Sequence, residues 1–203
     1  MASNNLMGRI SAPAALRPPL WARMSVVTGN MVQLAGLVLG AALLYLAAHS
    51  AVASGVRIAL MILGWFAIYV CCHASAHWAV GRLVGIRFQG YGLRGTDHPE
   101  DYPPLVRQLM SVLPFFTALT EKESMQHARP WAKALMFAAG ETSTALWSIG
   151  VGWYAWQSGI PGGQWLFTIM VVFNVVSTVV TALVPRGDYT KARRALRQAH
   201  RMH

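Results

Sequence analysis

Residues 58–81 place the strongest constraint on what this chain can fold into. These 24 residues contain no Asp, Glu, Lys or Arg. A helix needs about 20 consecutive apolar residues to cross the hydrocarbon core of a bilayer. The composition agrees, because 55% of the 203 residues are hydrophobic and only 12% are charged. The run therefore predicts a transmembrane helix in an integral membrane protein.

Further apolar runs predict additional spans. Residues 29–56 also lack charged side chains and are long enough for a first span. Two more apolar runs lie between residues 134 and 185, and the turn sequence SGIPGG at residues 158–163 separates them. We therefore predict an all-α polytopic membrane protein with about four transmembrane helices.

The basic residues predict how these spans are oriented. Three precede the first run, seven lie in residues 82–133 and six follow residue 185, whereas the first short loop holds only Arg57 and the turn at 158–163 holds none. With four spans, the basic segments all share one side, and the positive-inside rule makes that side cytoplasmic. We expect an integral protein of the bacterial inner (plasma) membrane with both termini cytoplasmic.

The net charge of +10 follows from this topology and from attraction to anionic lipids. We expect membrane lipids and a transmembrane partner or substrate helix as partners, and no nucleic acid. The chain divides into a cytoplasmic leader, a first transmembrane span, a membrane core and a basic amphipathic cytoplasmic tail, at residues 1–28, 29–56, 57–187 and 188–203.

Three segments outside the spans carry their own patterns. Residues 84–91 alternate as a short strand does. Residues 105–119 are apolar but short and are broken at Pro114, so we expect an interfacial or re-entrant cytoplasmic segment. The tail at 188–203 has small apolar residues on one side of a basic helix, which suits contact with the inner leaflet.

Ionisable residues inside the spans are the candidate functional residues, because lipid penalises them. His73 and His77 share one helix face at i and i+4, which is a common metal-chelating geometry. An alternative is that both imidazoles hydrogen-bond to neighbouring helices. By helix rise, Glu141 lies about 12 Å from the cytoplasmic end of its span, at a depth similar to that of the histidines.

Three sequence phrases resemble the site-2 protease family of intramembrane zinc metalloproteases. The family has H-E-x-x-H followed by a phrase like ALxARxLGIRV, and this chain has HASAHWAVGRLVGIRFQGYGL at residues 73–93. The family's AGPxAN phrase corresponds to AGETST within residues 128–147. Its NxxPxxxxDG and RxLRAL phrases correspond to TALVPRGDYTKARRALR at residues 181–197. The three phrases occur in the family's order.

The resemblance implies a site-2-protease-like core with zinc as a possible cofactor. It carries over His73, His77 and Asp188 as metal ligands, the usual number for a zinc that keeps one position open. The chain departs from the family at the general base, because Ala74 replaces the catalytic Glu and a methyl group cannot accept a proton. Further departures are Glu141 for Pro, Thr144 for Asn, Tyr189 for Gly and Thr181 for Asn.

These departures leave three functions open. The first is a degenerate, non-proteolytic member that acts as a regulator or subunit of a membrane assembly. The second is an active metalloprotease in which Glu141 replaces the missing base as the catalytic residue. The third is a haem- or pigment-binding subunit, although histidines at i and i+4 cannot lie on opposite faces of one haem.

Overall fold

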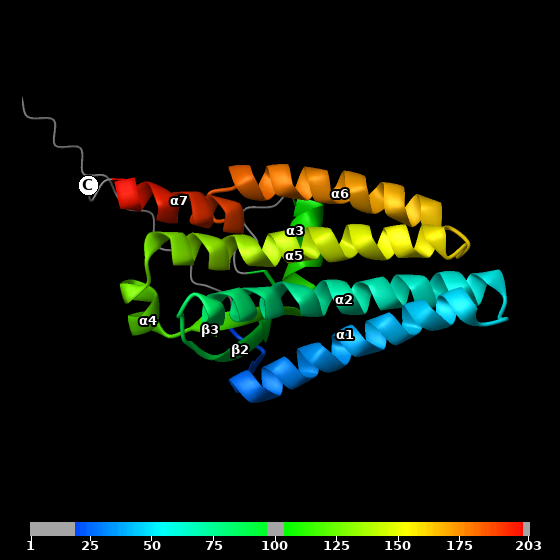
Figure 1. The fold of residues 1–203 in the computed structure, drawn as a ribbon, viewed down its shortest axis with the longest axis horizontal. Helices are drawn as coiled ribbons and strands as arrows, with labels where there is room; N and C mark the ends of the chain where they lie inside the picture. The colour runs from blue at the N-terminus through cyan, green and yellow to red at the C-terminus, as the bar shows by residue number, and fades with distance from the viewer. Residues whose placement is uncertain (1–18, 97–103, 201–203) are drawn as a thin grey trace, which may run out of the picture.

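The fold is a bundle of long helices with a small sheet at one end. The computed structural model describes residues 19–96 and 104–200, so most of the predicted leader lies outside the described residues. Helices α1 (Val26–His49), α2 (Ser54–Leu83), α5 (Pro130–Gln157) and α6 (Gly163–Leu183) run side by side. Helix α7 (Asp188–His200) continues beside the beginning of α5 (Figure 1).

Within the described residues, three helices are long and apolar enough to cross a membrane. They are α1, α2 and α6, and α2 contains the charge-free run at residues 58–81. The chain therefore has the character of an integral membrane protein. The fourth predicted span corresponds to α5, which has 28 residues but is not among the three. Its middle carries Glu141 beside a run of hydroxyl side chains, which lowers its hydropathy.

The boundary between the first two helices differs from the predicted one. The first predicted span extended to residue 56, whereas α1 ends at His49 and α2 begins at Ser54. Ser50 ends α1, because both its backbone N–H and its hydroxyl donate to the carbonyl of Leu46. These bonds use a carbonyl that the helix leaves unpaired at its C-terminus.

The non-helical part is larger than a single short strand. Strands β1 (Ala22–Met24), β2 (Phe88–Arg94) and β3 (Phe115–Thr120) form an antiparallel sheet in the order β1-β2-β3. The strand predicted at residues 84–91 begins later, because α2 continues to Leu83 and Gly85 turns the chain with a φ of 87°. The end of the predicted leader supplies β1.

The predicted interfacial or re-entrant segment at residues 105–119 also differs. It divides at Pro114 into a short helix, α3 (Pro104–Val112), and strand β3. Strand β3 pairs with β2 from Phe115 to Thr120, which satisfies backbone groups that β2 would otherwise leave open on that edge. A six-residue helix, α4 (Lys122–His127), then leads into α5.

Close packing on α2 fixes the direction of its histidine face. A methyl group at Gly40 would lie 2.6 Å from Ile68 and 2.8 Å from the carbonyl of Gly64, so α1 and α2 touch backbone to backbone. Small residues permit this approach between membrane helices. Helix α5 packs against a different face of α2, and that face carries His73 and His77.

The sequence predicts that the small apolar face of the tail contacts the inner leaflet. In the structure, α7 buries this face against α5 instead. Ala192 and Ala195 are buried against Ala134 of α5, with Phe137 and Ala138 packed around them. The exposed face of α7 carries arginines, and Lys191 lies over the ring of Phe137 at 5.8 Å from its centroid. The first residue of this helix, Asp188, is thereby held beside the bundle.

Candidate metal centre

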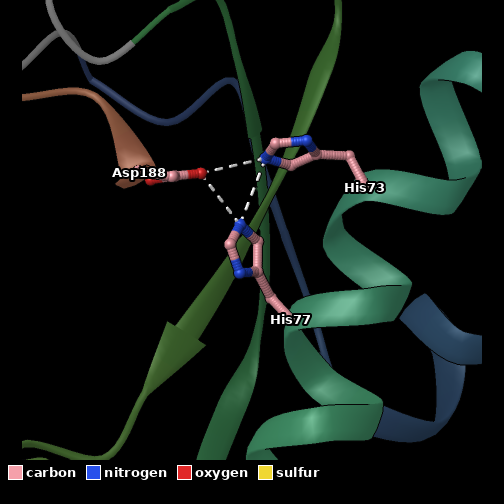
Figure 2. Close-up of side chains that lie close together, drawn as sticks. All are labelled: His73, His77 and Asp188. Carbon is pink, nitrogen blue, oxygen red and sulfur yellow. Dashed lines mark hydrogen bonds and ion pairs between the residues drawn. The ribbon is translucent and has the colours of Figure 1, made fainter. Parts of the chain in front are cut away.

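His73, His77 and Asp188 converge on one point (Figure 2). The Nε2 atoms of the two imidazoles lie 3.1 Å apart. Oδ2 of Asp188 lies 3.1 Å from Nε2 of His77 and 3.4 Å from Nε2 of His73. The three residues join positions 111 residues apart in the sequence, and they form a group that could hold a metal ion.

Two backbone features bring Asp188 to the histidines. Helix α6 returns the chain to the end of the bundle at which α2 ends, and α7 begins five residues after α6. The hydroxyl of Thr190 donates to the carbonyls of Thr181 and Ala182 at 3.2 and 3.0 Å. Because these carbonyls belong to the last turn of α6, the first turn of α7 is fixed relative to α6.

The outer nitrogen of each imidazole is held by a hydrogen bond. Nδ1 of His77 lies 2.6 Å from the carbonyl oxygen of Met136, which can only accept, so this Nδ1 carries the proton. Nδ1 of His73 lies 3.1 Å from the hydroxyl oxygen of Thr144. That hydroxyl donates its own hydrogen to the carbonyl of Gly140 at 3.0 Å, and it therefore accepts from His73.

These bonds determine what faces the centre of the cluster. A neutral imidazole protonated at Nδ1 has a lone pair at Nε2, so both histidines aim lone pairs at the Asp188 carboxylate. Three acceptors within 3.4 Å of one another repel unless something positive lies between them. A proton added to one Nε2 can form a hydrogen bond to only one of the other two acceptors. A metal ion can bind all three acceptor atoms at once.

Asp188 is ionised and oriented by its neighbours. Its second oxygen, Oδ1, accepts from the ammonium group of Lys191 at 2.8 Å. Burial alone would raise the pKa of Asp188. The two imidazoles and the ammonium group of Lys191 outweigh that effect, and the pKa lies well below its usual range. The carboxylate is therefore available as an anionic ligand at neutral pH.

Gly140 packs directly against the two imidazoles of this cluster. A methyl group at this position would collide with Nε2 of His77 and would lie 2.8 Å from Nε2 of His73. Glycine therefore lets the backbone of α5 approach the two candidate ligand nitrogens closely, where any other residue would collide with them. The residues present fit a small cation, because three donor atoms converge and the protonation of both imidazoles leaves their Nε2 atoms free to bind it.

Glu141 is near the cluster but is not one of its members. Its carboxylate interacts electrostatically with His73, His77 and Asp188. It does not belong to the group of ligand atoms that lie within 4.8 Å of one another, and it makes no hydrogen bond with the described residues. The predicted ligands therefore lie together, and the predicted base is a neighbour at longer range.

Several residues around the metal centre were not predicted to act there. The carbonyl of Met136 left no sequence signal, because every residue has a carbonyl. Lys191 did have a sequence signal, because it lies three residues after Asp188 and residues at i and i+3 are neighbours on a helix. Thr144 was noticed only as a departure from the family's Asn.

Comparisons with known proteins identify no relative. No protein-family model, curated protein or solved structure matches this chain.

Proposed function

We propose that this chain is a zinc-binding integral membrane protein with a site-2-protease-like core, acting as a non-proteolytic regulator or subunit of a membrane assembly. The observation that carries the metal-binding part is the pair of Nδ1 hydrogen bonds, which leave two imidazole lone pairs facing the Asp188 carboxylate. In this proposal α5 is the fourth span, both termini are cytoplasmic, and the protein resides in a bacterial inner membrane.

The spacing of the three donors favours zinc. In a tetrahedral site with bonds of about 2.0–2.1 Å, ligand atoms lie about 3.3 Å from one another. The three separations here are 3.1, 3.1 and 3.4 Å. Two nitrogens and one carboxylate oxygen are ordinary zinc ligands, and three protein ligands leave a fourth position for water. When bound, zinc supplies Lewis acidity at that position.

The surroundings of Ala74 support a non-proteolytic role. Ala74 occupies the position of the family's catalytic Glu, and its side chain is completely buried, with 0% exposure. A glutamate side chain has no space there unless neighbouring groups move. In this proposal the chain therefore lacks a base at this position.

Metal analysis tests the proposal directly. The full-length protein, purified in detergent, should contain about one zinc ion per chain, and His73→Ala with His77→Ala should reduce this content at least tenfold. His127→Ala is the matched control, because His127 is exposed on α4 and away from the cluster. Wild-type protein that stays metal-free after incubation with zinc would overturn the metal-binding proposal.

A second candidate function is an active metalloprotease with Glu141 as the base. The electrostatic interaction of Glu141 with all three cluster residues favours it. The proposed function predicts that wild-type protein cleaves no member of a panel of single-span substrates, and that Ala74→Glu destabilises the fold without restoring cleavage. Metal-dependent cleavage that disappears in Glu141→Gln, with zinc content retained, would establish the protease instead.

The cluster geometry argues against the haem alternative. The Nε2 atoms of His73 and His77 face each other across 3.1 Å. A planar macrocycle cannot enter that gap, and its iron would compete with Asp188 for the same nitrogens. The absence of a visible absorption band in purified protein is the expected result.

A further inference from the structure

A hollow lies at the end of the bundle, separate from the candidate metal centre. It has a volume of about 520 Å³ and opens between the end of α2, the short helix α4 and the beginning of α5. Figure 1 shows these three segments together at one end of the molecule. None of the residues that line the hollow belongs to the His73, His77 and Asp188 cluster.

Charges of both signs line this hollow without pairing. Arg87 and Arg129 contribute guanidinium groups, and Glu121 and Glu123 contribute carboxylates. None of these four side chains forms an ion pair with a residue in the described part of the chain. A hollow lined by charges of both signs is complementary to a ligand that itself carries both charges.

The backbone adds donors beside Arg129. Helix α5 begins at this hollow, with Pro130 in its first turn and no hydrogen bond from the Arg129 side chain to cap it. The N–H groups of Trp131 and Ala132 precede the first intrahelical bond, which Lys133 makes to the carbonyl of Arg129. The positive end of a helix favours a phosphate group, and here it supplements two arginines.

The hollow lies at the level where the helices leave the apolar region. Helix α2 ends at Leu83, which is 86% exposed, and α5 begins beside Trp131, which is 46% exposed. Exposed apolar and tryptophan side chains next to arginines are typical of the headgroup region of a bilayer. A ligand that reaches this hollow from the membrane presents its headgroup to it.

We propose that this hollow binds the headgroup of a zwitterionic phospholipid of the phosphatidylethanolamine class. Its phosphate lies against Arg87, Arg129 and the first turn of α5, and its ammonium group meets the carboxylates of Glu121 and Glu123. A choline headgroup lacks ammonium hydrogens for these carboxylates, and a glycerol headgroup lacks the positive charge. The proposal rests on membrane insertion and is independent of metal binding.

Native mass spectrometry of the full-length protein in uncharged detergent tests this site. Wild-type protein should retain phosphatidylethanolamine more strongly than phosphatidylglycerol or phosphatidylcholine. Each basic group near a membrane surface contributes about a fivefold change in binding, so Arg87→Gln with Arg129→Gln should weaken retention about 25-fold. Arg193→Gln with Arg194→Gln on α7 removes the same charge elsewhere and should change retention less than about twofold.

A second pair of substitutions tests the role of the acidic residues in lipid retention. Glu121→Gln with Glu123→Gln should weaken phosphatidylethanolamine retention about 25-fold, if a carboxylate contributes as an arginine does, and should leave phosphatidylglycerol retention unchanged or higher. Retention of both lipids to the same extent by wild-type protein would overturn the proposal, as would equal losses in the α7 variant. Displacement of the lipid by millimolar inorganic phosphate would reassign the hollow to free phosphate.

Retained zinc content and an unchanged thermal transition show that each variant is folded. If the double arginine variant does not fold, Arg129→Gln alone carries the test, with an expected fivefold loss. Failure of lipid binding in protein that contains zinc would leave the proposed function in place. Wild-type protein that retains the lipid but binds no zinc would overturn the proposed function and leave the lipid site in place.

Discussion

Gly140 determines how closely α5 approaches the two imidazoles. The backbone of Gly140 packs directly against both imidazoles, and a β-carbon at this position would collide with their Nε2 atoms. In Gly140→Ala, we expect zinc affinity to fall at least tenfold, because the methyl group overlaps the ligand nitrogens. Competition with a chromophoric chelator measures this change.

Gly150 provides the matched control on the same helix. A methyl group there would meet no atom within 4 Å. Gly150→Ala should keep wild-type zinc affinity and should gain about 0.5–1 kcal/mol of stability, since alanine favours helix. Equal zinc affinity in Gly140→Ala and Gly150→Ala would show that the proposed ion does not lie beside Gly140.

Thr144 orients His73 through a hydrogen bond to Nδ1. Groups that orient metal-ligating histidines typically change affinity by about 10–100-fold when they are removed. We expect Thr144→Val to weaken zinc binding within this range and Thr144→Ser to preserve it, because serine retains the hydroxyl. Thr168→Val on α6 is the control, since its hydroxyl bonds only within its own helix turn. A valine variant with wild-type affinity would contradict the assigned tautomer.

At the scale of elements, the packing of α7 on α5 brings Asp188, a candidate metal ligand, to the bundle. The helix docks on α5 through Ala192 and Ala195, and this contact holds Asp188 beside the histidines of α2. We expect Ala195→Arg to displace α7, because a long charged side chain cannot replace a buried methyl group. Zinc affinity should then fall to that of Asp188→Ala.

The control introduces the same positive charge on the exposed face of α7. Gln198 is exposed, so Gln198→Arg should leave docking and zinc affinity unchanged. Isothermal titration of the three variants with zinc separates the outcomes. If Ala195→Arg binds zinc as tightly as wild type, α7 docking does not position Asp188.

At the scale of the whole molecule, the proposed arrangement with α5 as a fourth span predicts that the two ends of the bundle lie on opposite sides of the membrane. Gln157 lies at the end of α5, and Gln126 lies on α4 at the opposite end; both side chains are exposed. In protein with Cys71→Ala and Cys72→Ala, Gln157→Cys should react with an impermeant thiol reagent added outside the cell. Gln126→Cys should react only after permeabilisation, and the reverse pattern would overturn the orientation.

The sequence by itself determined the membrane character and the main candidate residues of this protein. Long runs without charge can satisfy their backbone only as helices in lipid, so the apolar helices follow from local composition. The spacing of His73 and His77 fixed their common face, since helical periodicity is a local property. Their link to Asp188 came from a resemblance of short phrases rather than from any local rule.

Only the tertiary structure decided what those residues form together. The sheet required three segments that lie far apart in the chain, and strand pairing between distant segments has no local signature. The shape of the candidate metal centre depends on Gly140, Thr144 and the carbonyl of Met136, all supplied by α5. Their contribution arises from the packing of α5 against α2, because hydrogen-bond partners and close contacts between helices are properties of the assembled bundle.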